Sequence, residues 1–199
     1  MRMQTRRNYK LENTTDPSKR GAVGFSTIEL AIVVVTIMIM AALAIPQAIG
    51  TIRALRAVSD ARNLATQLAL AKMRAADGFT QSRLNCNTTS RSCQLEICTS
   101  KGTSTCNTFT AEGGPVNLSE GTSFGFGTLT TPAGSQATIQ NTAQILFNSR
   151  SLPVDSTGAP TSNYALYITN QAGTKYAITV YATGRIAVWQ YVNGAWSTQ

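Results

Sequence analysis

The longest run of apolar residues in the chain lies between Phe25 and Ile45. As an α-helix this run would be about 32 Å long, enough to cross the hydrocarbon core of a bilayer. One carboxylate, Glu29, lies near its start. A charged group in a membrane-length segment is costly, so we expect it to have a function. The pattern predicts a membrane-spanning helix over residues 25–45.

A second pattern begins after Pro46, a residue type that removes an internal hydrogen bond and kinks or ends a helix. From here apolar residues recur at three- and four-residue steps, and charged residues fill the other faces. Gly78 is a good stop signal, so we expect an amphipathic helical continuation over residues 46–78. The apolar positions are Ile45, Ile49, Ile52, Ala61, Leu64, Leu68, Ala71 and Ala75, and the charged ones are Arg53, Arg56, Asp60, Arg62 and Lys72.

The remainder, residues 79–199, is rich in Thr, Ser, Asn and Gly and contains short alternating runs, which predict a β domain. Residues 79–91 are expected to form a loop, and residues 152–162 a turn-rich connection. The apolar inner face of such a domain needs a cover, and the amphipathic half of the helix is available. The strands expected before residue 150 are 94–99, 108–112, a loose strand around Phe124 and Phe126, and 144–148.

The clearest strands lie at the C-terminus. Apolar residues alternate over 164–168 and 176–180, with turn residues Ala172-Gly173 between them, and Thr183-Gly184 then turns the chain into 185–191. Asn193-Gly194 is a favoured two-residue hairpin turn before Trp196. This predicts a meander of three or four antiparallel strands. The predicted fold class is α+β, with one long N-terminal helix packed on a C-terminal antiparallel β domain.

The composition argues against an enzyme. None of the 199 residues is histidine, which excludes Ser-His-Asp and Cys-His nucleophile arrangements and histidine-based zinc sites. Carboxylates are sparse after the apolar run, no two of them form a recognisable acid/base motif, and no glycine-rich phosphate loop follows a strand. We therefore expect no catalytic residue, no metal and no cofactor.

All four cysteines, Cys86, Cys93, Cys98 and Cys106, follow the predicted helix. An even count in an oxidising compartment predicts two disulfides, whereas a zinc site would need paired C-x-x-C spacings that are absent. Three pairings are possible. We favour Cys98–Cys106 across a hairpin, with Cys86–Cys93 closing the preceding loop.

The charges on either side of the apolar run predict its orientation. Residues 1–24 carry six basic and two acidic side chains, which account for half of the formal net charge of +8. Between the run and Asp60 the basic residues are Arg53 and Arg56. By the positive-inside rule the N-terminus stays cytoplasmic and the C-terminal domain, residues 79–199, is exported to the periplasm.

The heptapeptide Gly24-Phe25-Ser26-Thr27-Ile28-Glu29-Leu30 resembles the type IV prepilin signal. The resemblance implies that a membrane-embedded prepilin peptidase removes the leader, residues 1–24, and N-methylates the new terminal residue, Phe25. The apolar helix would be retained. An ordinary secretory signal has a shorter apolar stretch and is cut after it. The alternatives are an uncleaved signal anchor or cleavage near Ala48.

Glu29 has two compatible interpretations. With Ser26 it fits the S-x-x-E capping box, and an acid in the first helical turn suits the helix dipole. In pilins, the resemblance implies, this acid pairs with the terminal amine of a neighbouring subunit and helps to set register during assembly. Capping alone would tolerate an exposed site, so assembly is the favoured role.

Two C-terminal segments narrow the resemblance. Ile145–Asn148, followed by a turn-rich stretch and a strand ending in Thr183-Gly184-Arg185-Ile186, looks like the GspH/FimT family of minor pilins and pseudopilins. The resemblance implies a subunit of a type IV pilus or a type II secretion pseudopilus. Its partners would be other pilin or pseudopilin subunits, the prepilin peptidase and an inner-membrane assembly platform.

A DNA-binding minor pilin that serves natural transformation is the alternative function. Some FimT-like minor pilins are implicated in DNA uptake through a basic Gly-Arg-x-Arg loop near the C-terminus. The matching segment here is Gly184-Arg185-Ile186-Ala187, in which Ala187 replaces the second basic residue. Arg185 and Lys175 are the candidate DNA contacts, and a phosphate-dominated interaction of this kind would weaken steeply with salt.

Overall fold

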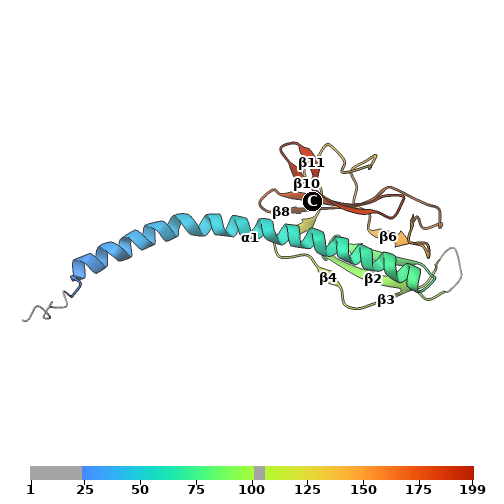
Figure 1. Cartoon of the computed structure of the whole chain (residues 1–199), viewed down its shortest axis with the longest axis horizontal. Helices are drawn as coiled ribbons and strands as arrows, with labels where there is room; N and C mark the ends of the chain where they lie inside the picture. The colour runs from blue at the N-terminus through green and yellow to red at the C-terminus, as the bar shows by residue number, and fades with distance from the viewer. Residues whose placement is uncertain (1–23, 101–105) are drawn as a thin grey trace, which may run out of the picture. The chain divides into compact units, whose positions relative to one another are not determined.

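The computed structural model describes residues 24–100 and 106–199 (Figure 1). The helix α1 (Thr27–Asp77) comes first and eleven strands follow it in this part of the chain. The chain divides into two compact units, with the boundary between Ala44 and Ile45 inside α1. Each unit is described by itself below.

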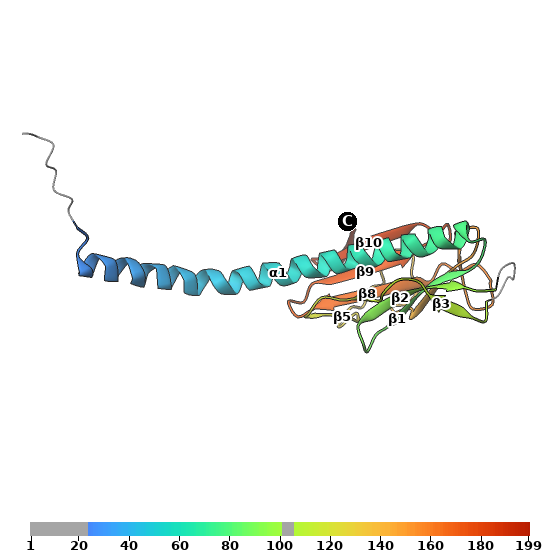
Figure 2. The same ribbon diagram turned by 90° about the horizontal axis from the view of Figure 1, so that it is seen from below.

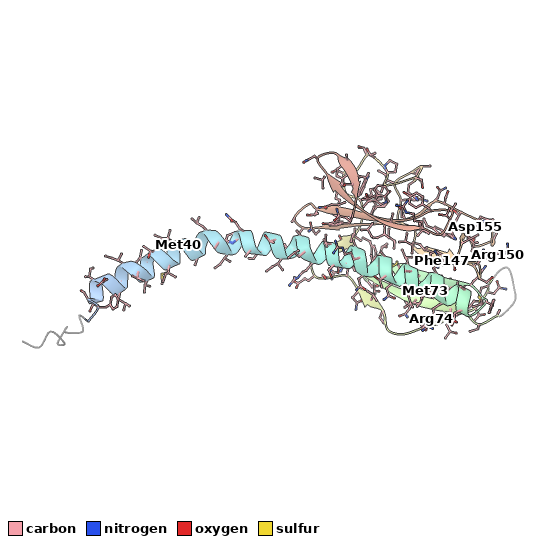
Figure 3. The ribbon with its side chains drawn as sticks, viewed as in Figure 1. Met40, Met73, Arg74, Phe147, Arg150 and Asp155 are labelled. Atoms are coloured by element: carbon pink, nitrogen blue, oxygen red, sulfur yellow. A yellow bond between two sulfur atoms is a disulfide. The ribbon has the colours of Figure 1, made fainter. Side chains whose placement is uncertain are left out.

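In the first unit, α1 is an exposed helix. The Leu30 amide donates to the Ser26 carbonyl at 3.1 Å, which places Ser26 at the N-cap position. Glu29 lies in the first turn, where the helix dipole favours a carboxylate. Side chains project from the ribbon into open space, Met40 among them (Figure 3). This stretch of α1 packs against nothing in the described part of its own unit.

In the second unit, α1 runs through Pro46 and becomes one-sided. It ends at Asp77, where the Gly78 amide still donates to the Arg74 carbonyl at 3.0 Å. Only the later part of the predicted apolar stripe is buried. Ile49 and Ile52 are exposed, and the first buried position is Ala57. The buried positions are Ala57, Asp60, Ala61, Leu64, Leu68, Ala71 and Ala75.

Two antiparallel sheets complete the second unit. The first has the order β3-β2-β1-β6-β7, with β4 paired to β2, and the second has the order β11-β10-β9-β8-β5. The first sheet contains β1 (Ser82–Asn87), β2 (Ser92–Cys98), β3 (Phe109–Ala111), β4 (Val116–Asn117), β6 (Gln144–Phe147) and β7 (Pro153–Val154). The second contains β5 (Thr122–Phe124), β8 (Tyr164–Asn170), β9 (Lys175–Val180), β10 (Ile186–Val192) and β11 (Ala195–Thr198).

The expected loop over residues 79–91 is wrong, because Ser82–Asn87 is a central strand of the first sheet. It pairs with β2 on one side and β6 on the other. Ser82, Leu84 and Cys86 alternate inward, and the Ser82 hydroxyl donates to the Ala71 carbonyl of α1. A polar residue is stable in the core when it is hydrogen-bonded. β1 therefore has a polar residue, Ser82, at an inward position, and its sequence lacks the regular apolar alternation from which strands are predicted.

One core joins the helix to both sheets. Leu64 and Leu68 of α1 are fully buried against Phe147 of the first sheet and Leu166 and Ile178 of the second. Figures 1 and 2 show the second half of α1 running alongside both sheets. The predicted fold class is therefore confirmed, with one long helix on an antiparallel β domain.

A second cluster fills the other face of the β8–β11 sheet. Its centre is Tyr167, fully buried, whose hydroxyl accepts a hydrogen bond from the Ala133 amide at 3.0 Å. The Trp196 ring lies 5.9 Å from that of Tyr167, and its indole donates to the Thr131 carbonyl at 2.9 Å. The C-terminal meander is confirmed, and its aromatic residues pack the sheet.

Two disulfides lie in the first sheet, as the even cysteine count predicts. Cys86–Cys93 joins directly opposite residues of β1 and β2. Cys98–Cys106 links the end of β2 to the segment before β3. Both favoured pairings are confirmed, and the first bridge closes the β1–β2 hairpin from within its two strands, because Cys86 belongs to the unexpected strand β1. Both bridges close short loops, so each fixes local structure more than it constrains the whole chain.

Candidate functional site

The exposed apolar surface of α1 is the most unusual feature of the described chain. Phe25 is 83% exposed, Met40 71% and Leu43 69%. Burying one such side chain contributes about 1.5–3 kcal/mol, so a helix covered with them needs an apolar environment. By length and composition α1 could cross a membrane, and it is the one helix among the described residues that could.

Glu29 lies at the start of this apolar surface. It is exposed, and among the described residues it takes part in neither of the two salt bridges, which are Arg74–Glu112 and Arg83–Glu96. Beside it, the helix surface has a shallow hollow that exposes apolar atoms and is lined by Ile28, Ala31, Ile32, Val35 and Thr36. The carboxylate thus borders an uncovered apolar stripe, where a cation brought by another helix could pair with it.

The two residues of the predicted cleavage site are accessible. Gly24 and Phe25 are exposed and precede the first residue of α1. A Cβ built on Gly24 meets no described atom within 4 Å. The predicted leader, residues 1–24, lies outside the described residues except for Gly24 itself.

A polar contact near Asp60 holds α1 to the loop before β5. We expected Asp60 on a face of the helix other than the apolar one, and this is wrong, because the residue is buried with the apolar positions and only 6% exposed. Its carboxylate accepts hydrogen bonds from the Ser119 hydroxyl at 2.8 Å and the Ser119 amide at 3.0 Å. A buried carboxylate is costly without such partners. The two bonds from Ser119 therefore stabilise the buried charge of Asp60, and the same bonds hold the loop against α1. The spacing of apolar residues could not predict that this aspartate is buried.

A second contact holds the helix near the same end. The Asn170 side-chain amide, at the end of β8, donates to the Arg53 carbonyl of α1 at 3.1 Å. This bond ties the second sheet to the part of α1 that precedes its buried face. We infer that α1 cannot bend away from the sheet here without losing it.

The far end of α1 is held by Lys72. Its ammonium donates to the Gly184 carbonyl in the β9–β10 turn at 3.0 Å. The Ser151 hydroxyl, in the turn before β7, donates to the Lys72 carbonyl at 3.4 Å. Arg74 forms a salt bridge of 2.6 Å with Glu112. The Thr183-Gly184-Arg185 turn is therefore part of the contact between helix and sheet.

Tyr164 links β8 to β7 through a hydrogen bond. Its hydroxyl donates to the Val154 carbonyl. Burial, together with the nearby charge of Asp155, raises the pKa of Tyr164 to about 12. The hydroxyl therefore remains a neutral donor at physiological pH.

The two candidate DNA contacts do not come together. Lys175 is opposite Tyr191 at one end of the β9–β10 ladder, whereas Arg185 precedes the pair Ile186–Val180 at the other end. Five residues of strand separate these ends by about 17 Å. The Lys175 ammonium lies 5.6 Å from the Tyr191 ring centre, and the Arg185 guanidinium 5.5 Å from that of Tyr181. Each cation lies over a different ring, and they form no shared basic patch.

Comparison with known proteins gives a partial picture. No protein-family model and no curated protein matches the chain. Two solved structures of the minor pseudopilin EpsH, from the type II secretion system of Vibrio cholerae, are similar to it at 14% identity. The alignments cover 67% of this chain and 95% and 92% of the EpsH chains, with TM-scores of 0.46 and 0.45. A likeness of this size assigns no function to this chain.

Proposed function

We propose that this chain is a minor pilin or pseudopilin subunit that assembles through α1 into a type IV pilus or a type II secretion pseudopilus. The observation that carries the proposal is the exposed apolar helix with Glu29 in its first turn. Lipid would cover this surface before assembly, and helices of other subunits would cover it in a filament. The β domain, held to α1 by polar contacts at both ends of its buried face, would coat the outside.

The proposal assigns a role to each segment. Residues 1–24 are a leader that a prepilin peptidase removes in the inner membrane, and Phe25 becomes the N-methylated terminus. Residues 25–45 span the membrane and later enter the filament core. Residues 46–78 carry the β domain, residues 79–199, which lies in the periplasm. The Gly24-Phe25 motif and the charge asymmetry around the apolar run support this order.

Glu29 would act through its charge. The amine freed by cleavage at Gly24-Phe25 is a cation close to the acid of a neighbouring subunit. In an apolar bundle such a pair is only weakly screened, and one charge without the other is strongly unfavourable. Pairing would therefore admit subunits in one register and disfavour the others.

The substitution Glu29→Gln separates capping from assembly, because glutamine can still complete a capping box but carries no charge. We expect normal leader removal, shown by the mass of the membrane-bound protein, and at least about a tenfold drop in the fraction recovered in sheared filaments.

Thr66→Ala is the matched control. Thr66 is exposed on the same helix, outside the apolar surface beside Glu29, and its hydroxyl donates to the Arg62 carbonyl within the helix at 2.9 Å. This variant should enter filaments as the native chain does. Normal incorporation of the Glu29→Gln variant would remove the assembly role of the acid.

A further inference from the structure

The part of α1 that follows Ile45 borders an open cavity of about 270 Å³. The walls come from two places in the second unit: the helix, and the end of the β5–β8 pair at which Glu120 and Gly121 lead into β5 and Gln171 follows β8. The lining residues that matter here are Ile49, Ile52, Arg53, Arg56, Glu120 and Gln171.

Charges of both signs line this cavity. Arg53 and Arg56 come from α1, and Glu120 comes from the loop before β5. All three are exposed, and none of them belongs to either salt bridge that the described residues form. The cavity thus offers two cations and one carboxylate that have not neutralised one another. A ligand with a negative and a positive group would match this arrangement.

The walls are fixed before any ligand arrives. Next to Glu120, Ser119 is bound twice by the buried Asp60 carboxylate. The Gln171 amide donates to the Gly121 carbonyl at 3.1 Å, and Asn170 donates to the Arg53 carbonyl. A preorganised site loses little conformational entropy on binding, so a small ligand can be held.

The position of the cavity along α1 indicates the source of the ligand. If the membrane span ends at Ile45, Arg53 lies about 12 Å further along the helix. The headgroup layer is about 5–8 Å thick on each side of the hydrocarbon, and arginine side chains are long enough to reach back into it. Ile49 and Ile52, 44% and 48% exposed, lie on the way and stay outside the protein core.

We propose that this cavity binds the headgroup of a phospholipid that carries a primary ammonium group, such as phosphatidylethanolamine, in the periplasmic leaflet. The inference rests on the proposed membrane insertion of α1. Arg53 and Arg56 hold the phosphate, because guanidinium groups bind phosphate oxygens with charge-assisted hydrogen bonds. Glu120 holds the ammonium, and Ile49, about 6 Å beyond Ile45 along the helix, lies at the depth of the headgroup layer.

Glu120 sets the choice of lipid. A headgroup with a phosphate but no cation, such as phosphatidylglycerol, would satisfy the arginines and leave the Glu120 carboxylate unpaired. A choline headgroup carries a cation without N–H donors and could not hydrogen-bond to Glu120. The order of preference is therefore ethanolamine first, with glycerol and choline lipids behind it.

The test uses the full chain in nanodiscs of phosphatidylcholine that contain a minor share of either phosphatidylethanolamine or phosphatidylglycerol. Native mass spectrometry measures which lipids stay bound on release. We expect enrichment of phosphatidylethanolamine that falls about tenfold in the double variant Arg53→Gln/Arg56→Gln, the loss expected from one charge-assisted hydrogen bond or more. Glu120→Gln should remove the preference for ethanolamine over glycerol lipid, and Arg150→Gln is the control at an exposed arginine outside the cavity.

Each other outcome overturns the proposal. Unchanged enrichment in the cavity variants would place the lipid elsewhere, and a preference for phosphatidylglycerol would refute the role of Glu120. Displacement of the lipid by millimolar inorganic phosphate would show a site for free phosphate, and loss of a dimer rather than of lipid would show a second copy in the cavity. Failure of every variant and of the native chain to enter nanodiscs would instead defeat the membrane insertion of α1.

Discussion

At Gly184 two turns of the β domain meet the helix. The glycine has φ of +76°, and a Cβ at this position would collide with the Ser151 carbonyl oxygen and approach the Lys72 ammonium. The Gly184 carbonyl is also the acceptor for Lys72. Gly184, which the sequence indicates only as a turn residue, is thus one of the places where α1 contacts the second sheet.

Replacing Gly184 with alanine should destabilise the domain by about 2–4 kcal/mol, because it adds left-handed backbone strain to a steric clash. Gly173→Ala is the matched control, since Gly173 has φ of +79° and its Cβ would meet no described atom within 4 Å. The Gly173→Ala variant should lose about 1 kcal/mol in the free energy of unfolding, from backbone strain alone. Urea unfolding of the full chain in detergent, followed by tryptophan fluorescence, measures both. Equal losses in the two variants would show that the close approach does not matter.

At the scale of elements, α1 and the loop before β5 depend on Asp60. Asp60→Ala leaves the Ser119 amide and hydroxyl without their acceptor, and we expect a loss of about 1–3 kcal/mol in the free energy of unfolding. Hydrogen exchange at residues 118–121 should increase at the same time. The control is Asp77→Ala, an exposed aspartate of the same helix, which should stay within about 0.5 kcal/mol of the native chain. Stability unchanged by Asp60→Ala would mean that the loop is held by packing alone.

The sequence predicted the elements whose apolar pattern matches their burial. β8 and β9 are apolar in sequence and buried along nearly their whole length, and the helix positions from Ala61 to Ala75 recur at helical spacing. It failed where a hydrogen bond makes a polar residue acceptable inside. Asp60 was expected outside the apolar face and Ser82 in a loop, yet both are buried and hydrogen-bonded to partners on other elements, 59 and 11 residues away. Such partners cannot be found from local spacing.

For the candidate functional residues too, the sequence predicted some features and missed others. The apolar length of α1 and the acid at position 29 are local properties, so the sequence alone indicated them. The separation of Lys175 from Arg185 depends on the β9–β10 register, and the cavity at Arg53 and Glu120 depends on loop positions. Neither follows from the order of residues.

In the whole molecule, α1 is a helix with two environments. From Ala57 onward it is packed into the β domain, and before Ala44 its apolar side chains are exposed. A chain with this division needs lipid or other helices around its first half. In the proposed assembly, proteolysis next to Gly24 creates the terminal amine that pairs with Glu29 of a neighbouring subunit.

The most direct measurement is the intact mass of the protein taken from the membrane of its own cells, with its N-terminal peptide sequenced. We predict a chain that begins at Phe25, carries one N-methyl group and contains both disulfides. A native protein that begins at Met1, or at any residue beyond Pro46, would contradict it.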